Sequence, residues 1–224
     1  QGWQYDGQEG FGYGGIYDCS LYLSDRYGAE IISVTGDRLP MYAYSPYTLE
    51  DLSATDGNNC TIGAVTRLMS YEGRLNIPFF GRDPFEIYPI VRNRAVQHGY
   101  HPSLGTLPVV ISSLIETSAR DVGRSNVRSR GVYIWDFKSE VVDQINAYKM
   151  PIMNILRGYY ENHSVAVIGY RIYKTKVNSR VREFPMIAIC DGWTDGNIKY
   201  IDYMDFAYNF VYAGIGSFNT IYYV

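Results

Sequence analysis

The sequence predicts an α+β fold, in which a largely helical segment precedes a largely β-stranded one. Over residues 51–130 apolar positions recur at helical spacing, whereas from about residue 131 short β-branched and aromatic runs alternate with turn residues. Hydrophobic residues make up 46% of the 224 residues, which is enough to bury a substantial core. Helices and antiparallel strands that segregate along the chain are typical of this class.

Three helices are expected in the helical segment. The first covers 60–72, where four apolar residues share one face and Gly73 follows as a stop signal. The second covers 83–97 and opens with an Asp cap, a first-turn proline and a glutamate that completes a capping box. The third begins near residue 106, with Pro108 in its first turn, and runs to about residue 119.

The second half of the chain is expected to form an antiparallel sheet or barrel. Beta-branched and aromatic residues, bounded by turn residues, mark its strands. One short helix, over 139–148, interrupts the series after its first strand. The expected strands are 131–135, 151–157, 163–173, 185–190, 197–203 and 214–224.

The domain organisation follows from these patterns. Residues 1–50 form a Tyr- and Gly-rich N-terminal extension, expected to pack on the core, with extended pieces at 30–34 and 40–44. Residues 51–224 form the main domain, divided into a helical part at 51–130 and a β part at 131–224. A cleft between two such parts is the first place to look for a site.

Composition excludes several function classes. The formal net charge is −3, so nothing draws the protein generally toward nucleic acid. No run of eighteen apolar residues predicts a membrane span, and no signal peptide opens the chain. Only five of the 20 basic residues are lysine, which favours a secreted or cell-surface bacterial protein. Compositional drift in a cytosolic protein is the alternative.

Cys60 has the setting of a nucleophile. It follows the turn-forming residues 56–59 and begins an amphipathic helix. The positive end of a helix dipole favours a thiolate over a thiol, and the preceding turn can present N–H groups to an anion. The alternative is a small apolar core residue that happens to begin a helix.

The chain contains three histidines, and His163 is the strongest catalytic candidate among them. It begins an apolar strand and follows a polar loop, so a rigid backbone would hold it at the mouth of a cleft. A strand-edge histidine satisfied by the backbone is the alternative. His98 and His101 end the second helix without an acidic or cysteine partner nearby, so no metal and no cofactor are expected.

Asp191 follows another apolar strand and precedes Gly192 and Trp193. A carboxylate there could orient an imidazole by accepting its N–H, and Trp193 could shield that hydrogen bond from water. The alternative is a simple Asp-Gly turn.

Together these segments resemble the papain-like cysteine peptidases. Residues 162–170 (NHSVAVIGY) look like their histidine strand, the helix that Cys60 opens (CTIGA) is similar to their nucleophile helix, and Asp191-Gly192-Trp193 resembles their Asn-Ser-Trp segment. The likeness covers roughly residues 51–224. It is greatest to bacterial members, namely the double-glycine-leader peptidase-like and the staphopain and streptopain-type domains.

The resemblance implies a two-lobed fold, with a helical lobe, a β lobe and the site in the cleft between them. It also implies hydrolysis of peptide bonds in a peptide or protein substrate, with a Cys60 thiolate as the nucleophile, His163 as the acid and base, and Asp191 as the orienting residue. Trp193 would cover the bond between His163 and Asp191.

One departure concerns the oxyanion hole. The family places a glutamine six residues before the nucleophile, whereas Ala54 stands there in this chain. The nearest amide donors are Asn59 and Asn58, and the loss of one such donor costs about 3–4 kcal/mol in other enzymes. The second hypothesis is therefore an inactive or weakly active papain-like binding or structural module. Group transfer, as in transglutaminases, is a third.

The three cysteines, Cys19, Cys60 and Cys190, cannot all form disulfides within one chain. Cys60 is expected to be the reactive thiol. Cys190 is expected on a core strand, and the sequence leaves open whether it pairs with Cys19.

Overall fold

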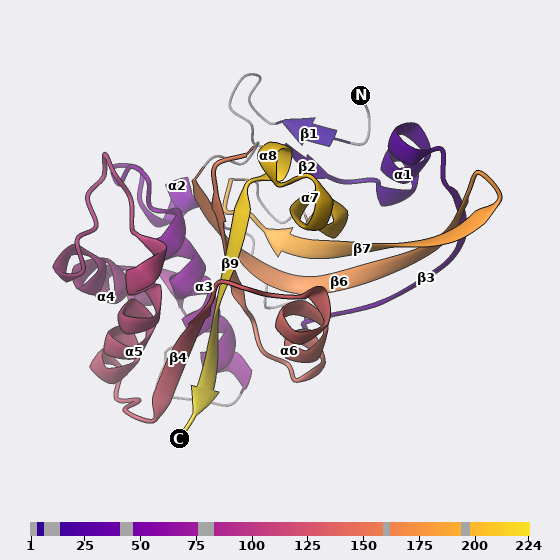
Figure 1. Ribbon diagram of the computed structural model, residues 1–224. Helices are drawn as coiled ribbons and strands as arrows, with labels where there is room; N and C mark the ends of the chain where they lie inside the picture. Colours follow the sequence, from indigo (N-terminus) through magenta and orange to yellow (C-terminus); the bar gives the residue numbers. More distant parts are fainter. Residues whose placement is uncertain (1–3, 7–13, 41–46, 76–82, 159–161, 194–197) are drawn as a thin grey trace.

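The computed structural model describes residues 4–6, 14–40, 47–75, 83–158, 162–193 and 198–224, and it confirms the α+β class (Figure 1). All strand pairings within these residues are antiparallel. The strands are β1 (Gln4–Asp6), β2 (Gly14–Ile16), β3 (Glu30–Arg38), β4 (Val127–Val132), β5 (Ile152–Leu156), β6 (His163–Val177), β7 (Arg180–Cys190), β8 (Lys199–Asp202) and β9 (Ile215–Tyr223).

The helices are distributed between the strands along the chain. The main group, α3 to α5, gathers on one side of the molecule in Figure 1. No described helix has the length and apolar character needed to cross a membrane. The helices are α1 (Cys19–Tyr27), α2 (Leu49–Leu52), α3 (Cys60–Leu75), α4 (Pro84–Gln97), α5 (Ile111–Asp121), α6 (Asp143–Asn146), α7 (Tyr203–Tyr208) and α8 (Phe210–Ala213).

The strands form one sheet in the order β1-β2-β8-β7-β6-β5-β9-β4, and β3 pairs with β6 beside this path. Residues 14–38, within the expected N-terminal extension, thus contribute strands to the sheet itself. β4 joins the sheet through β9, so the end of the expected helical part also belongs to it. The expected strand at 40–44 falls mostly on residues 41–46, outside the described residues.

The three expected helices are present with altered ends. α3 continues through Gly73 to Leu75, and α4 begins at Pro84 behind its Asp83 cap. α5 starts at Ile111 rather than near residue 106, after a 3-10 turn at Pro108–Val110. The reason is Pro108, because the residue before a proline is held in an extended conformation.

Two expectations about the β part are wrong in detail. The strand expected at 131–135 is β4 at Val127–Val132, because its pairing with β9 sets the register and leaves Ile134 97% exposed. The helix expected at 139–148 is a π-helical turn (Lys138–Val142) followed by the short α6, and Tyr148 adopts a left-handed conformation beyond it.

The β6–β7 hairpin is longer than the sequence indicates. Its strands pair from Ala166 and Cys190 out to Val177 and Arg180. Asn178 and Ser179 both have positive φ angles at the tip, as a two-residue type I′ turn requires. The Arg- and Lys-rich segment over 171–182 is therefore ordinary hairpin, and it is the long twisted ribbon at the right of Figure 1.

A single hydrophobic core joins the helices to the sheet among the described residues. α3 contributes a buried stripe that includes Ile62, Val65 and Leu68, and these pack beneath β5 and β6. Phe184 of β7 and Phe218 of β9 are fully buried in the same cluster. The shared core holds the first turn of α3 against the start of β6, which positions the candidate nucleophile.

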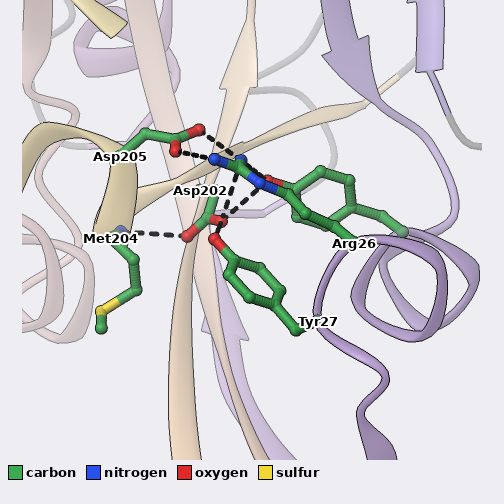
Figure 2. A network of polar contacts seen from close by, with 6 residues as sticks. Arg26, Tyr27, Asp202, Met204 and Asp205 are labelled. Carbon is green, nitrogen blue, oxygen red and sulfur yellow. Dashed lines mark hydrogen bonds and ion pairs between the residues drawn. The ribbon is translucent and has the colours of Figure 1, made fainter. Parts of the chain in front are cut away.

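A polar cluster joins α1 to the segment after β8 (Figure 2). Arg26 contacts both carboxylate oxygens of Asp205, at 2.8 and 2.5 Å. Asp202 is fully buried, accepts hydrogen bonds from Tyr22 and Tyr27 at 2.8 and 2.6 Å, and caps α7 through the N–H of Met204. This cluster ties the N-terminal helix to the C-terminal part of the sheet.

Replacement of Asp202 by alanine should destabilise the fold. The variant leaves two tyrosine hydroxyls without their acceptor and removes the α7 cap. We expect the free energy of unfolding in urea to fall by about 2–3 kcal/mol. The exposed residue Asp25 on α1 provides the control, since Asp25→Ala should change it by less than about 0.5 kcal/mol. Equal losses in the two variants would contradict the role given to Asp202.

Candidate active site

Cys60 is the first residue of α3 and is partly exposed. The first hydrogen bond of the helix runs from the N–H of Gly63 to the carbonyl of Asn59, at 2.9 Å. The N–H groups of Cys60–Ile62 therefore precede the helical ladder, and they carry the positive end of the helix dipole. The thiol lies where an anion is favoured.

The turn before Cys60 is fastened to α4 and the loop after it. Asp56 accepts hydrogen bonds from Arg92 Nε at 2.7 Å and from the Tyr88 hydroxyl at 2.9 Å. The Arg92 hydrogen bond lowers the pKa of the Asp56 carboxyl, which therefore stays ionised. The Tyr100 hydroxyl donates to the Gly57 carbonyl at 2.7 Å. These contacts fix the backbone that presents the thiol.

His163 is the first residue of β6 and is 4% exposed. It lies close enough to Cys60 for its hydrogen-bonding capacity and its charge to lower the pKa of the thiol. Its Nε2 lies 2.7 Å from the backbone carbonyl oxygen of Asp191. A carbonyl oxygen can only accept, so Nε2 carries a proton in this contact. Nδ1 is then the ring nitrogen left for Cys60, with a lone pair that can take the thiol proton.

The surroundings of Cys60 favour its thiolate. Burial by itself would raise the pKa of the thiol, but the hydrogen bond and the charge of His163 act in the opposite direction. The backbone of Ser164 and the side chain of Thr61 also act to lower the pKa of the thiol. The net result is a Cys60 pKa below the ordinary value, which raises the fraction of thiolate at a given pH.

Trp193 lies against the imidazole. The two rings stack with their centroids 3.7 Å apart and an interplanar angle of 12°. The stacked indole covers one face of His163 next to the hydrogen bond that Nε2 makes with Asp191. The bond that the sequence analysis expects Trp193 to shield runs from His163 to the Asp191 carboxylate, whereas the bond present here runs to the Asp191 carbonyl.

Asp191 is adjacent to His163, but its contacts differ from those expected. Its backbone carbonyl, rather than its carboxylate, accepts the hydrogen bond from Nε2. The carboxylate accepts the N–H of Trp193 on Oδ1 at 2.9 Å and the ammonium of Lys199 on Oδ2 at 2.5 Å. The physical reason is charge, because a buried lysine on the next strand pairs with the nearest buried carboxylate.

The two proposed oxyanion donors are engaged to different degrees. Asn59 is buried, and its amide nitrogen donates to the Tyr88 hydroxyl at 2.9 Å and to the Leu49 carbonyl at 3.4 Å. Both of its amide hydrogens thus point away from an incoming carbonyl. Asn58 donates to the Pro102 carbonyl at 2.7 Å and keeps a second amide hydrogen. Of the two side chains, only Asn58 retains a donor for an oxyanion.

Several polar residues behind Cys60 were missed by sequence reasoning. The Thr61 and Ser164 hydroxyls lie 3.0 Å apart, and Ser164 donates to Asn154 Oδ1 at 2.8 Å. Asn154 donates in turn to Asn219 Oδ1 at 2.7 Å. These side chains join α3 to three strands of the sheet. Small hydroxyl and amide residues on strands carry no pattern that separates such a network from surface positions.

A cavity of about 520 Å³ opens beside the thiol. Residues 103–108, between α4 and α5, line it on one side, and Leu104 and Leu107 there are largely exposed. The end of β5, including Leu156, lines it on the other. Cys60, His163 and Trp193 all contribute to its wall, so the activated thiol is reachable from solvent.

The other histidines and cysteines lie outside this arrangement. His98 Nε2 is within 3.3 Å of the Thr117 hydroxyl, and His101 Nδ1 is 2.7 Å from the Ser103 hydroxyl. Among the described residues, no group of three or more His, Cys, Asp and Glu side chains is placed to hold a metal ion. Cys19 and Cys190 are both free thiols, so the pairing that the sequence left open does not occur.

Comparison of the sequence with protein-family models and with curated proteins gives no match. The assignment of a function therefore depends on the chemistry of the Cys60 site.

The three thiols should differ sharply in reactivity. Burial raises the pKa of Cys19 to about 12 and that of Cys190 to about 11, whereas the pKa of Cys60 is lowered. Treatment with iodoacetamide at about pH 6.5, below the pKa of an ordinary thiol, should give one adduct, located on Cys60 by peptide mass spectrometry. His163→Ala should slow this alkylation by at least about tenfold. Equal labelling of all three thiols would contradict the pKa order.

Proposed function

We propose that this protein is a cysteine peptidase of the papain-like type, with a helical lobe, a β lobe and its site in the cleft between them. The neighbouring pair of Cys60 and His163, in which the imidazole lowers the pKa of the thiol, carries the proposal. The thiol begins a helix, the imidazole begins a strand, and both line one cavity. This is the setting that nucleophilic catalysis by cysteine requires.

The first chemical step is acylation. With the proton on Nε2 held by the Asp191 carbonyl, Nδ1 of His163 takes the proton of the thiol, and the thiolate attacks the carbonyl carbon of the scissile amide. As the tetrahedral intermediate collapses, the carbon–nitrogen bond breaks and Nδ1–H protonates the leaving amine. A thioester between Cys60 and the acyl part of the substrate remains.

The second step is hydrolysis of the thioester. His163 Nδ1 takes a proton from a water molecule, and the resulting hydroxide attacks the thioester carbon. The carbon–sulfur bond breaks, the acid product leaves and the thiolate–imidazolium pair forms again. The backbone N–H of Cys60, ahead of the helical ladder, and the second amide hydrogen of Asn58 are the groups that we assign to the developing oxyanion.

A peptide or protein is the substrate that this site fits best. Apart from the Cys60–His163 pair, the residues that line the cavity in the described part of the chain are uncharged. Its walls combine exposed leucines with asparagine, serine and threonine side chains and with turn backbone. Such a surface suits an extended chain with apolar side chains and amide groups.

A catalytically weak binding module is the second candidate. The observation that favours it is Asn59, whose amide is directed to Tyr88 and Leu49 rather than into the cavity. If the hole lacks a second donor, the thiol would still be activated but peptide-bond cleavage would be slow. The two candidates therefore agree on Cys60 labelling and differ in turnover.

The deciding experiment measures hydrolysis of a broad peptide library by the parent protein and by two variants. Cys60→Ala and His163→Ala should each lower the rate by about 10³-fold or more, because the nucleophile and its base act as a unit. An epoxysuccinyl thiol inhibitor should modify Cys60 of the parent and abolish turnover. Cleavage products identified by mass spectrometry then give the sequence preference.

Cys19→Ala is the matched control, because it removes a thiol that lies on α1 outside the cavity. It should leave hydrolysis unchanged. Labelling of Cys60 without any hydrolysis above that of Cys60→Ala would favour the binding module. Failure of both labelling and hydrolysis would reject the peptidase.

A further inference from the structure

We propose that Lys199 is a positioning residue for His163, acting through the carboxylate of Asp191 and the turn that begins there. The effect of this positioning on catalysis rests on the proposed peptidase function. Its first observation is a buried ion pair: Lys199 Nζ lies 2.5 Å from Asp191 Oδ2, and both side chains are 1% exposed. A lysine that is buried to this degree needs a specific partner.

The carboxylate of Asp191 is held at both oxygens. Oδ2 receives the Lys199 ammonium, and Oδ1 accepts the backbone N–H of Trp193 at 2.9 Å. The side chain of Asp191 thus closes the turn over residues 191–193 and joins it to the first residue of β8. That strand is fixed in turn, because Lys199 pairs with Ile189 in the β7–β8 ladder.

Two contacts that orient His163 come from this same turn. The Asp191 carbonyl accepts the Nε2 proton at 2.7 Å, which sets the tautomer and the direction of the ring edge. The Trp193 ring stacks on the imidazole face at 3.7 Å, which sets the plane of the ring. A change in the turn therefore changes both constraints on the imidazole.

Two further features show that the turn has little freedom elsewhere. Gly192 has a φ of +82°, and a Cβ at this position would come within 2.8 Å of the Leu49 side chain. The Gly192 carbonyl accepts the N–H of Leu49 at 2.8 Å. α2 therefore limits one side of the turn and Lys199 holds the other. Without the ammonium, the buried carboxylate would become protonated or turn toward water, and the 191–193 backbone would move with it.

Other ionisable groups lie near the 191–193 turn and the Cys60 thiol. Arg67 of α3 and Cys190 of β7 line the small cavity that also contacts Cys60 and Asp191. The Tyr100 hydroxyl is near enough to Cys60 for the sulfur's charge to act on it. Lys199 is the cation assigned to the Asp191 carboxylate, because its ammonium lies 2.5 Å from Oδ2.

The test is the pH dependence of Cys60 alkylation by iodoacetamide, because this rate follows the thiolate fraction and needs no substrate. In Lys199→Met the 191–193 turn should orient the His163 imidazole less precisely toward Cys60. The apparent pKa of the Cys60 thiol should therefore rise. We expect the rate at about pH 5.5 to fall about tenfold, while the rate at about pH 9 stays within about twofold of the parent.

A double variant keeps the experiment decisive if Lys199→Met alone does not fold. Asp191→Asn combined with Lys199→Met leaves no buried charge unpaired, and the asparagine can still accept the Trp193 N–H. The link to β8 is nevertheless gone, so the low-pH rate should again fall. Ile115→Ala on α5 is the control for stability, since it opens a cavity in the core away from the site.

Three results would overturn the proposal: a parental alkylation profile in the double variant, a faster low-pH rate in Lys199→Met, or an equal shift in Ile115→Ala. A faster low-pH rate in Lys199→Met would mean that Lys199 keeps the Asp191 carboxylate from pairing with the His163 imidazolium. Because alkylation and peptide hydrolysis are measured separately, a protein that never cleaves peptides can still show or lack the Lys199 effect. The two proposals therefore fail independently.

Discussion

The packing of the first turn of α3 against the first residues of β6 is the contact on which the site depends. The Thr61 and Ser164 hydroxyls meet there at 3.0 Å, and the residues just before them in the chain are Cys60 and His163. The buried face of α3 and the apolar start of β6 share one core, so the distance between thiol and imidazole is fixed by hydrophobic packing. The geometry of the proposed catalytic pair therefore follows from the geometry of the core.

The imidazole is oriented by a backbone turn in place of a free carboxylate. Because the Asp191 carboxylate is already neutralised by Lys199, the group that accepts the Nε2 proton is an uncharged carbonyl. A carbonyl fixes the tautomer as a carboxylate would, but it stabilises an imidazolium less. In the proposed ion pair the Cys60 thiolate would supply more of the stabilisation of a charged histidine, whereas the positive end of the α3 dipole favours the thiolate itself.

Sequence reasoning singled out residues that lie together in the structure, but it did not predict all of their contacts. Cys60, His163, Asp191 and Trp193 carry local signals: a helix start, two strand ends and a turn, and these segments lie together in the structure. Lys199 carried no usable signal, because one lysine in an apolar strand does not reveal its partner. The hydrogen-bond partner of the Asn59 amide could not be predicted from the sequence either, because Tyr88 lies on another helix.

The sequence by itself determined the α+β class, the three helices α3 to α5 and most strand positions, because these depend on apolar periodicity and local turn chemistry. Only the tertiary structure decided that β4 is shifted toward the N-terminus, that residues 14–38 join the sheet and that the Asp191 carbonyl faces His163. Register, edge pairing and hydrogen-bond partners are set by residues distant in the chain, and no local pattern encodes them.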